Sequence, residues 1–133
     1  MSGRYDSYTQ FEFDKPADRV LRITFNKPER LNSVDMDGHR ELCEIWRDID
    51  RDPDVNAVIL RGSGRAFSAG GDFSLIEKII DDPKYRWAAL REARDLVYNV
   101  INCSKPIVSA IHGPAVGAGL VAALLSDISI AAR

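Results

Sequence analysis

Hydrophobic and polar residues along the chain follow two periods, and their order predicts the order of strands and helices. Alternation of apolar and polar residues over residues 8–14 and 20–25 predicts two strands. A turn is predicted at Lys15–Asp18, so these strands form an antiparallel hairpin. Short apolar runs predict buried strands at residues 57–61 and 107–111, and residues 128–131 begin a further strand.

Apolar residues at helical spacing predict helices between these strands. The first is capped by Ser33 or Asp35 and ends before Asp52, and its apolar face is Leu42, Ile45, Trp46 and Ile49. The others are predicted at residues 73–80, 84–103 and 117–125. In the long helix the expected buried stripe is Leu90, Ala93, Val97, Val100 and Ile101, and the expected polar face is Arg91, Glu92, Arg94 and Asp95.

Strands that alternate with helices favour a layered α/β fold in one domain over residues 1–133. The last predicted strand is followed only by Ala132 and Arg133, so it leaves an exposed sheet edge. We therefore expect the chain to be the N-terminal part of a longer domain.

Composition and charge narrow the classes of function. A net charge of −2 gives no reason to expect nucleic-acid binding. The N-terminus lacks the apolar core of a signal peptide, and the run over residues 113–125 is too short to span a bilayer. Cys43 and Cys103 lie in predicted helices without metal-ligand spacing. We expect a cytoplasmic protein with reduced thiols, no metal site and no membrane contact.

Candidate chemistry lies in two glycine-rich turns that each connect a predicted strand to a predicted helix. The first glycine turn is residues 63–72 and the second is residues 113–119. Glycine allows close approach of the backbone to a ligand, and unpaired N–H groups at a helix start suit a developing negative charge. The two turns could place their amides on one oxygen as an oxyanion hole. They could equally be tight connections without further function.

Several segments, taken together, resemble the crotonase (enoyl-CoA hydratase/isomerase) superfamily. They are the loop Asn26–Ser33, the approach Asp52–Leu60, and the motifs Phe67–Asp72, His112–Gly119 and Ser126–Ile128, in family order and at family spacing. The resemblance covers nearly the whole chain. It implies a crotonase-like ββα superhelical spiral, here truncated, that binds an acyl-CoA thioester.

The resemblance also implies roles for individual residues. Gly71 N–H and Ala118 N–H would form the oxyanion hole for a thioester enolate. Asp72 and Asp127 would support the fold, and Lys27, Arg30 and Leu31 would lie near the adenosine end of coenzyme A, with the basic side chains as possible phosphate partners. The complete implied substrate-binding set is Lys27, Arg30, Leu31, Ala69, Gly70, Asp72, Phe73, Gly117 and Val121.

Val121 is the main departure from the hydratase pattern. In the hydratase branch a glutamate stands at this position, and a valine cannot transfer a proton. The second hydratase glutamate would fall after Arg133. Isomerases, decarboxylases, a dehalogenase and the naphthoate-synthase branch keep the oxyanion hole and move the acid–base group, so an acyl-CoA lyase or isomerase of fatty acid metabolism is expected. A non-catalytic acyl-CoA-binding or oligomer-scaffold member is the alternative.

Assembly and cofactors are also implied by the resemblance. Family members usually form homotrimers or homohexamers when full length, and coenzyme A enters as part of the substrate, so no separate cofactor is expected. Other candidates for chemistry are weaker. We expect Glu77 and His39 to be surface residues, His112 to support its turn, and Trp46 and Trp87 to be packing or interface residues.

Two nucleotide-binding motifs are disfavoured. Residues 117–122 read GxGxxA, but residues 112–116 separate this string from its strand, whereas a dinucleotide fingerprint opens directly off the strand. Neither glycine turn contains the Gly-Lys-Ser/Thr sequence of a phosphate-binding P-loop.

Overall fold

A five-stranded mixed sheet organises the computed structural model, which describes residues 3–133. Its strands lie in chain order, β1-β2-β3-β4-β5, and only the β1–β2 pair is antiparallel. The strands are β1 (Phe11–Ala17), β2 (Val20–Phe25), β3 (Ala57–Gly62), β4 (Ile107–Ile111) and β5 (Ile128–Ala131). Parallel pairing from β2 onward places the carboxyl ends of β3 and β4 at one edge, where both glycine turns begin.

The hairpin turn is shorter than the sequence predicts. β1 continues through Pro16 to Ala17, and the register shifts between Asp14 and Ala17. Pro16 fits because β1 is an edge strand, where a missing N–H costs no ladder bond. The predicted turn at Lys15–Asp18 is therefore wrong at its start, and the chain reverses at Asp18 and Arg19, where Arg19 has a φ of 57°.

The helices match their predicted positions closely, and carboxylates begin most of them. Asp35 caps the first helix by accepting a hydrogen bond from Gly38 N at 2.8 Å, so Asp35 and not Ser33 is the cap. Asp82 accepts from Lys84 N and Tyr85 N at the start of the long helix. The helices are α1 (Met36–Asp50), α2 (Phe73–Asp81), α3 (Pro83–Ile101) and α4 (Gly117–Leu125), and the 3-10 helix η1 is Pro28–Arg30.

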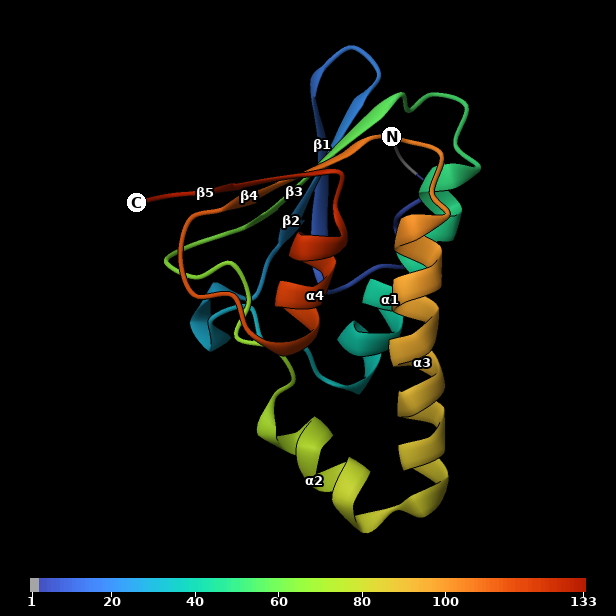
Figure 1. Ribbon diagram of the computed structural model, residues 1–133, viewed down its shortest axis with the longest axis vertical. Coiled ribbons are helices and arrows are strands. Elements are labelled where there is room, and N and C mark those ends of the chain that lie inside the picture. Colours follow the sequence, from blue (N-terminus) through green and yellow to red (C-terminus); the bar gives the residue numbers. More distant parts are fainter. Residues whose placement is uncertain (1–2) are drawn as a thin grey trace.

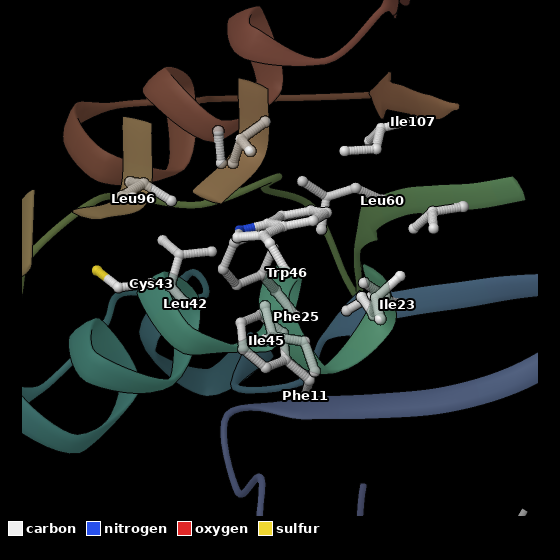
Figure 2. Close-up of a cluster of buried hydrophobic side chains, with 14 of the residues drawn as sticks. Phe11, Ile23, Phe25, Leu42, Cys43, Ile45, Trp46, Leu60, Leu96 and Ile107 are labelled. Atoms are coloured by element: carbon white, nitrogen blue, oxygen red, sulfur yellow. The ribbon is translucent and has the colours of Figure 1, made fainter. Parts of the chain in front are cut away.

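The core lies between the sheet and α1. Figure 1 shows the helices gathered on one side of the sheet, with α2 farthest from it. Trp46 of α1 is fully buried, and Figure 2 shows it among side chains from the strands and from α3. The members of this cluster labelled in Figure 2 are Phe11, Ile23, Phe25, Leu42, Cys43, Ile45, Trp46, Leu60, Leu96 and Ile107. Burial of this cluster holds in place the sheet edge from which the turns leave.

The predicted buried stripe of α3 is largely wrong. The residues that α3 buries are Ala89, Leu96 and Val100, while Leu90 and Ile101 are 55% and 56% exposed. α3 carries apolar residues on two sides, and its packing against α1 selects the side that is buried. Only Val100 of the predicted stripe belongs to the buried set.

The apolar runs are buried on one face of the sheet only. In β3, Val58 and Leu60 are buried beneath α1, whereas Ala57 and Ile59 are only partly buried. All four residues of β5 are exposed. The prediction of buried strands at residues 57–61 and 107–111 therefore holds for one face of the sheet only, because within residues 3–133 the helices cover a single face. None of the helices in this described range is both long and apolar enough to cross a membrane.

Candidate functional site

The two glycine turns lie against each other beyond the carboxyl ends of β3 and β4. Ser68 of the first turn pairs with Ala115 of the second in an isolated parallel bridge. Val116 N donates to Ser68 O at 2.9 Å, and Phe67 N and Ser68 N both donate to Pro114 O, at 3.0 and 3.1 Å. The turns are thus fixed to one another by backbone hydrogen bonds, although 47 residues separate the members of the bridge.

Two glycines with positive φ allow this approach. Gly70 has a φ of 81°, and a Cβ there would lie 2.9 Å from Val116 O. Gly117 has a φ of 58°, and a Cβ there would lie 4.0 Å from Gly71 N. A side chain at Gly70 would force the turns apart in addition to straining the backbone. The backbone at Gly71 therefore lies within a few ångströms of the residue that precedes Ala118.

The amides of Gly71 and Ala118 are both left without an acceptor. Within residues 3–133 neither donates a hydrogen bond. Ala118 is the second residue of α4, whose cap residue Val116 provides no side-chain acceptor. The first N–H groups of a helix have no intrahelical partner, and the helix dipole adds positive potential there. Two unpaired donors on adjoining turns can bind one oxygen that carries negative charge.

Asn32 is a residue of this site that sequence reasoning missed. It is fully buried, with a φ of 56°, and follows Leu31, whose φ is 54°. Its Oδ1 accepts from Lys27 N at 2.9 Å, and its Nδ2 donates to Ser63 O and Ala66 O at 2.8 and 2.9 Å. Asn32 therefore ties the η1 loop to the first glycine turn. Asparagine is one of the few residues that tolerate positive φ, and this property was the sequence signal that could have identified Asn32.

Asp72 is a helix cap, as predicted. Its Oδ1 accepts from Leu75 N at 2.9 Å and from Ser74 Oγ at 2.7 Å. Arg30 Nη1 lies 3.4 Å from Asp72 Oδ2 and 3.7 Å from Asp35 Oδ2, so the guanidinium links the caps of α1 and α2. Arg30 thus already pairs with carboxylates of the protein, and the contact of Arg30 with a phosphate stays a prediction.

Two other cations lie near the contact between the η1 loop and the first glycine turn. A Cβ at Gly64 would lie 2.9 Å from Pro28 Cβ, so Lys27 and Arg65 are each one residue from this contact. Neither forms an ion pair with another residue in the range 3–133. Beside them is a hollow of about 530 Å³ lined by Arg61, Gly62, Ser63, Gly64, Ala110 and His112. Arg65 was not among the predicted site residues.

The remaining predicted site residues lie close to the two turns. Ala69 N donates to Leu31 O at 2.9 Å, which places Leu31 beside the first turn. Phe73 begins α2 and is 87% exposed, and Val121, one turn into α4, is 40% exposed. A Cβ at Gly71 would lie 3.6 Å from Ile76 Cδ1. Two apolar side chains, Leu75 and Ile76, therefore lie beside Gly71.

Side chains that could move a proton are poorly placed at this site. Glu77 is exposed on α2, as expected. His112 Nε2 lies 2.7 Å from Gly64 O, and this contact ties the start of the second glycine turn to the first. Burial, with a smaller effect of Glu92, raises the pKa of Tyr85, so its hydroxyl stays protonated at neutral pH. Burial also raises the pKa of Cys43 to about 12, which makes that thiol unreactive.

Three expectations about individual residues are wrong. His39 was expected on the surface, but it is 7% exposed and its Nδ1 lies 2.6 Å from Glu92 Oε2. Glu92 was assigned to the polar face of α3, yet it faces α1 because the two helices pack side by side. Cys103 lies just beyond α3 and not within it.

Comparison with known proteins gives a family match over most of the chain. Residues 16–133 match the family model described as enoyl-CoA hydratase/isomerase. The chain is 36% identical over 118 residues to 1,2-epoxyphenylacetyl-CoA isomerase of Escherichia coli K12, covering 86% of this chain and 44% of that protein. It is also 36% identical over 118 residues to (E)-benzylidenesuccinyl-CoA hydratase of Thauera aromatica, with the same coverage of 86% and 44%.

A solved structure resembles the whole described fold. The crystal structure of an enoyl-CoA hydratase/isomerase from Mycobacterium paratuberculosis superposes with a TM-score of 0.89 at 38% sequence identity. The match covers 96% of this chain and 51% of that one. The chain thus spans about half the length of the solved relative and 44% of each curated relative described above.

Proposed function

The chain belongs to the enoyl-CoA hydratase/isomerase family, and from this premise we propose that it acts on an acyl-CoA thioester held at Gly71 and Ala118. The crotonase-like fold predicted from the sequence is confirmed by the structural likeness. The observation that carries the proposal is the contact between the two glycine turns, which brings two amides without acceptors onto adjoining segments.

The proposed chemistry is stabilisation of an enolate. Transfer of a proton from the carbon next to the thioester carbonyl to a general base moves the electron pair of that C–H bond onto the carbonyl oxygen. Gly71 N–H and Ala118 N–H would donate to that oxygen, and each such donor is worth about 2.7–4 kcal/mol of barrier. The stabilisation by these two hydrogen bonds grows as negative charge develops on the oxygen. The backbone donors are already in place, so no reorganisation is needed during the reaction.

The substrate is proposed to lie along the surfaces that join the turns. Ala69, Gly70 and Phe73 would line the path of the pantetheine, with Asp72 supporting the α2 end and Gly117 the α4 end. Lys27 and Arg65 would contact the phosphates of coenzyme A, because both are cations without a protein partner in the described residues. Leu31 would contact the adenine.

The acyl group is proposed to be apolar and to carry an aromatic ring. Ile76 lies beside Gly71, and Val121 follows Ala118 by one turn of α4; neither side chain can hydrogen-bond a polar acyl chain. The Escherichia coli and Thauera aromatica relatives are named for acyl-CoA compounds with a phenyl or benzylidene group. Val121 also disfavours hydration by a pair of glutamates, so isomerisation of the acyl group is the proposed reaction class.

A turnover panel tests the proposed function. We expect the purified protein to convert aromatic acyl-CoA esters with higher kcat/KM than short aliphatic enoyl-CoA esters, measured by chromatography of the CoA products. Calorimetry of CoA binding and light scattering of the assembly accompany the assay. Binding of coenzyme A with no turnover of any ester would contradict the proposed enzymatic function and favour the non-catalytic acyl-CoA-binding or scaffold alternative. Light scattering would detect the trimer or hexamer that a scaffold forms.

Lys27 and Arg65 supply a separate prediction about coenzyme A. Replacing either by glutamine is expected to raise the Kd for coenzyme A about fivefold at low salt, since a charge-assisted bond near the surface contributes about 1 kcal/mol. The difference should shrink at high salt because exposed charges are screened. Calorimetric titrations at two salt concentrations measure it. Arg40→Gln is the matched control, because Arg40 pairs with Asp37 on α1; equal losses in all three variants would contradict the assignment.

A further inference from the structure

Ser68 is a buried side chain that contacts every segment of the site. It is fully buried, and its Oγ donates to Asn32 O at 2.9 Å. The same oxygen accepts from Gly70 N at 3.2 Å. The hydroxyl therefore holds Gly70 through its N–H, while the peptide that carries the Gly71 amide is also held by Val34 N, which donates to Gly70 O at 2.8 Å.

Ser68 also sets the position of α4. A Cβ at Gly119 would lie 2.4 Å from Ser68 Cβ and 2.5 Å from Ser68 Oγ, so the first turn of α4 rests directly on this serine. The backbone of Ser68 bonds to Pro114 and Val116 on the chain leading into α4. Ser68 thus limits the approach of the first turn of α4 and holds the residue that precedes Gly71.

We propose, on the basis of the proposed function, that Ser68 is the positioning residue that aligns the amides of Gly71 and Ala118 on a common oxygen. Its hydroxyl holds the first turn through Gly70 and Asn32, and its Cβ limits the approach of α4. Serine meets both requirements, because its hydroxyl both donates and accepts while its side chain is small enough to fit against Gly119.

Ser109 provides a matched control. It is fully buried as well, and its Oγ donates to Ala123 O at 2.8 Å, near the opposite end of α4. Ser68→Ala and Ser109→Ala each remove one buried hydroxyl. Asn32 O then loses the donor Ser68 Oγ, whereas Ala123 O keeps a hydrogen bond from Ser129 Oγ at 2.7 Å. Only Ser68→Ala also removes the acceptor of a backbone amide next to Gly71.

The experiment measures kinetics and amide signals in the two variants. We expect Ser68→Ala to lower kcat about tenfold or more with little change in KM, as displacement of a donor from its working position does. Ser68→Cys, whose thiol is a weaker donor and acceptor, should fall between wild type and alanine. In ¹⁵N–¹H spectra, Ser68→Ala should move the Gly71 and Ala118 signals, and Ser109→Ala should change neither those signals nor kcat. Urea unfolding confirms that the proteins compared are folded.

Each outcome decides the role of Ser68. Equal effects of Ser68→Ala and Ser109→Ala on kcat and on the two amide signals would overturn the positioning role and leave a packing role. A wild-type protein that turns over no thioester would contradict the proposed function instead. In that case the amide signals still decide: signals that Ser68→Ala moves support the positioning role, and unmoved signals refute it.

Discussion

Gly71→Pro is expected to lower kcat on every processed CoA ester by about 10²–10³-fold, the usual cost of removing one oxyanion donor. Proline has no N–H, so the substitution deletes one of the two free amides outright. Positive φ is not the obstacle, because the glycines of the two turns with positive φ are Gly64, Gly70 and Gly117. The measurement is kcat and KM on the best ester of the turnover panel.

Gly71→Ala separates the loss of the amide from the addition of a side chain. A Cβ at this position would lie 2.8 Å from Leu75 Cδ2 and 3.6 Å from Ile76 Cδ1, both ends of side chains that can move. Alanine keeps the N–H, so we expect most of the activity to remain. If folded Gly71→Pro were as active as Gly71→Ala, the oxyanion role of this amide would be refuted.

Asn32→Ala is expected to lower the free energy of unfolding by about 3–5 kcal/mol. The substitution leaves Lys27 N, Ser63 O and Ala66 O without their partner, and each orphaned buried group costs about 1–3 kcal/mol. Alanine at positive φ adds strain of about 1 kcal/mol. Urea denaturation monitored by tryptophan fluorescence measures the loss.

Two further variants separate backbone strain from lost hydrogen bonds as causes of the expected destabilisation. Asn32→Gly relieves the positive φ but restores no hydrogen bond, so we expect it to recover only the strain. Asn56→Ala is the surface control, because Asn56 is exposed and its Oδ1 accepts one bond from Arg19 Nη2; it should change stability by less than about 0.5 kcal/mol. A loss of under 1 kcal/mol in Asn32→Ala would show that the η1 loop does not depend on this side chain.

Patterns within short segments predicted the elements well. The helix over residues 73–80 and the strand over residues 107–111 are observed as Phe73–Asp81 and Ile107–Ile111. Capping by Asp72 was also predictable, because a carboxylate before a helix accepts its first N–H groups in almost any fold. The hairpin turn was less predictable, since whether Pro16 can remain in a strand depends on the strand being at a sheet edge.

Contacts between distant segments were not predictable in the same way. His39 and Glu92 are 53 residues apart, and both have polar side chains that a single helix would place in solvent. The burial of His39 and the partial burial of Glu92 follow from the packing of α1 against α3. The same packing buried Leu96 of α3 in the core and left Leu90 exposed.

The sequence by itself determined the order of strands and helices, the two glycine turns, the family resemblance and the absence of a glutamate at Val121. Each of these depends on residues that are neighbours along the chain. Only the tertiary structure decided that the turns touch, that Ser68 and Asn32 hold them, and which faces of α3 and of the sheet are buried. The physical reason is that hydrogen bonds across turns and close packing depend on distances between segments, which no local pattern of residues specifies.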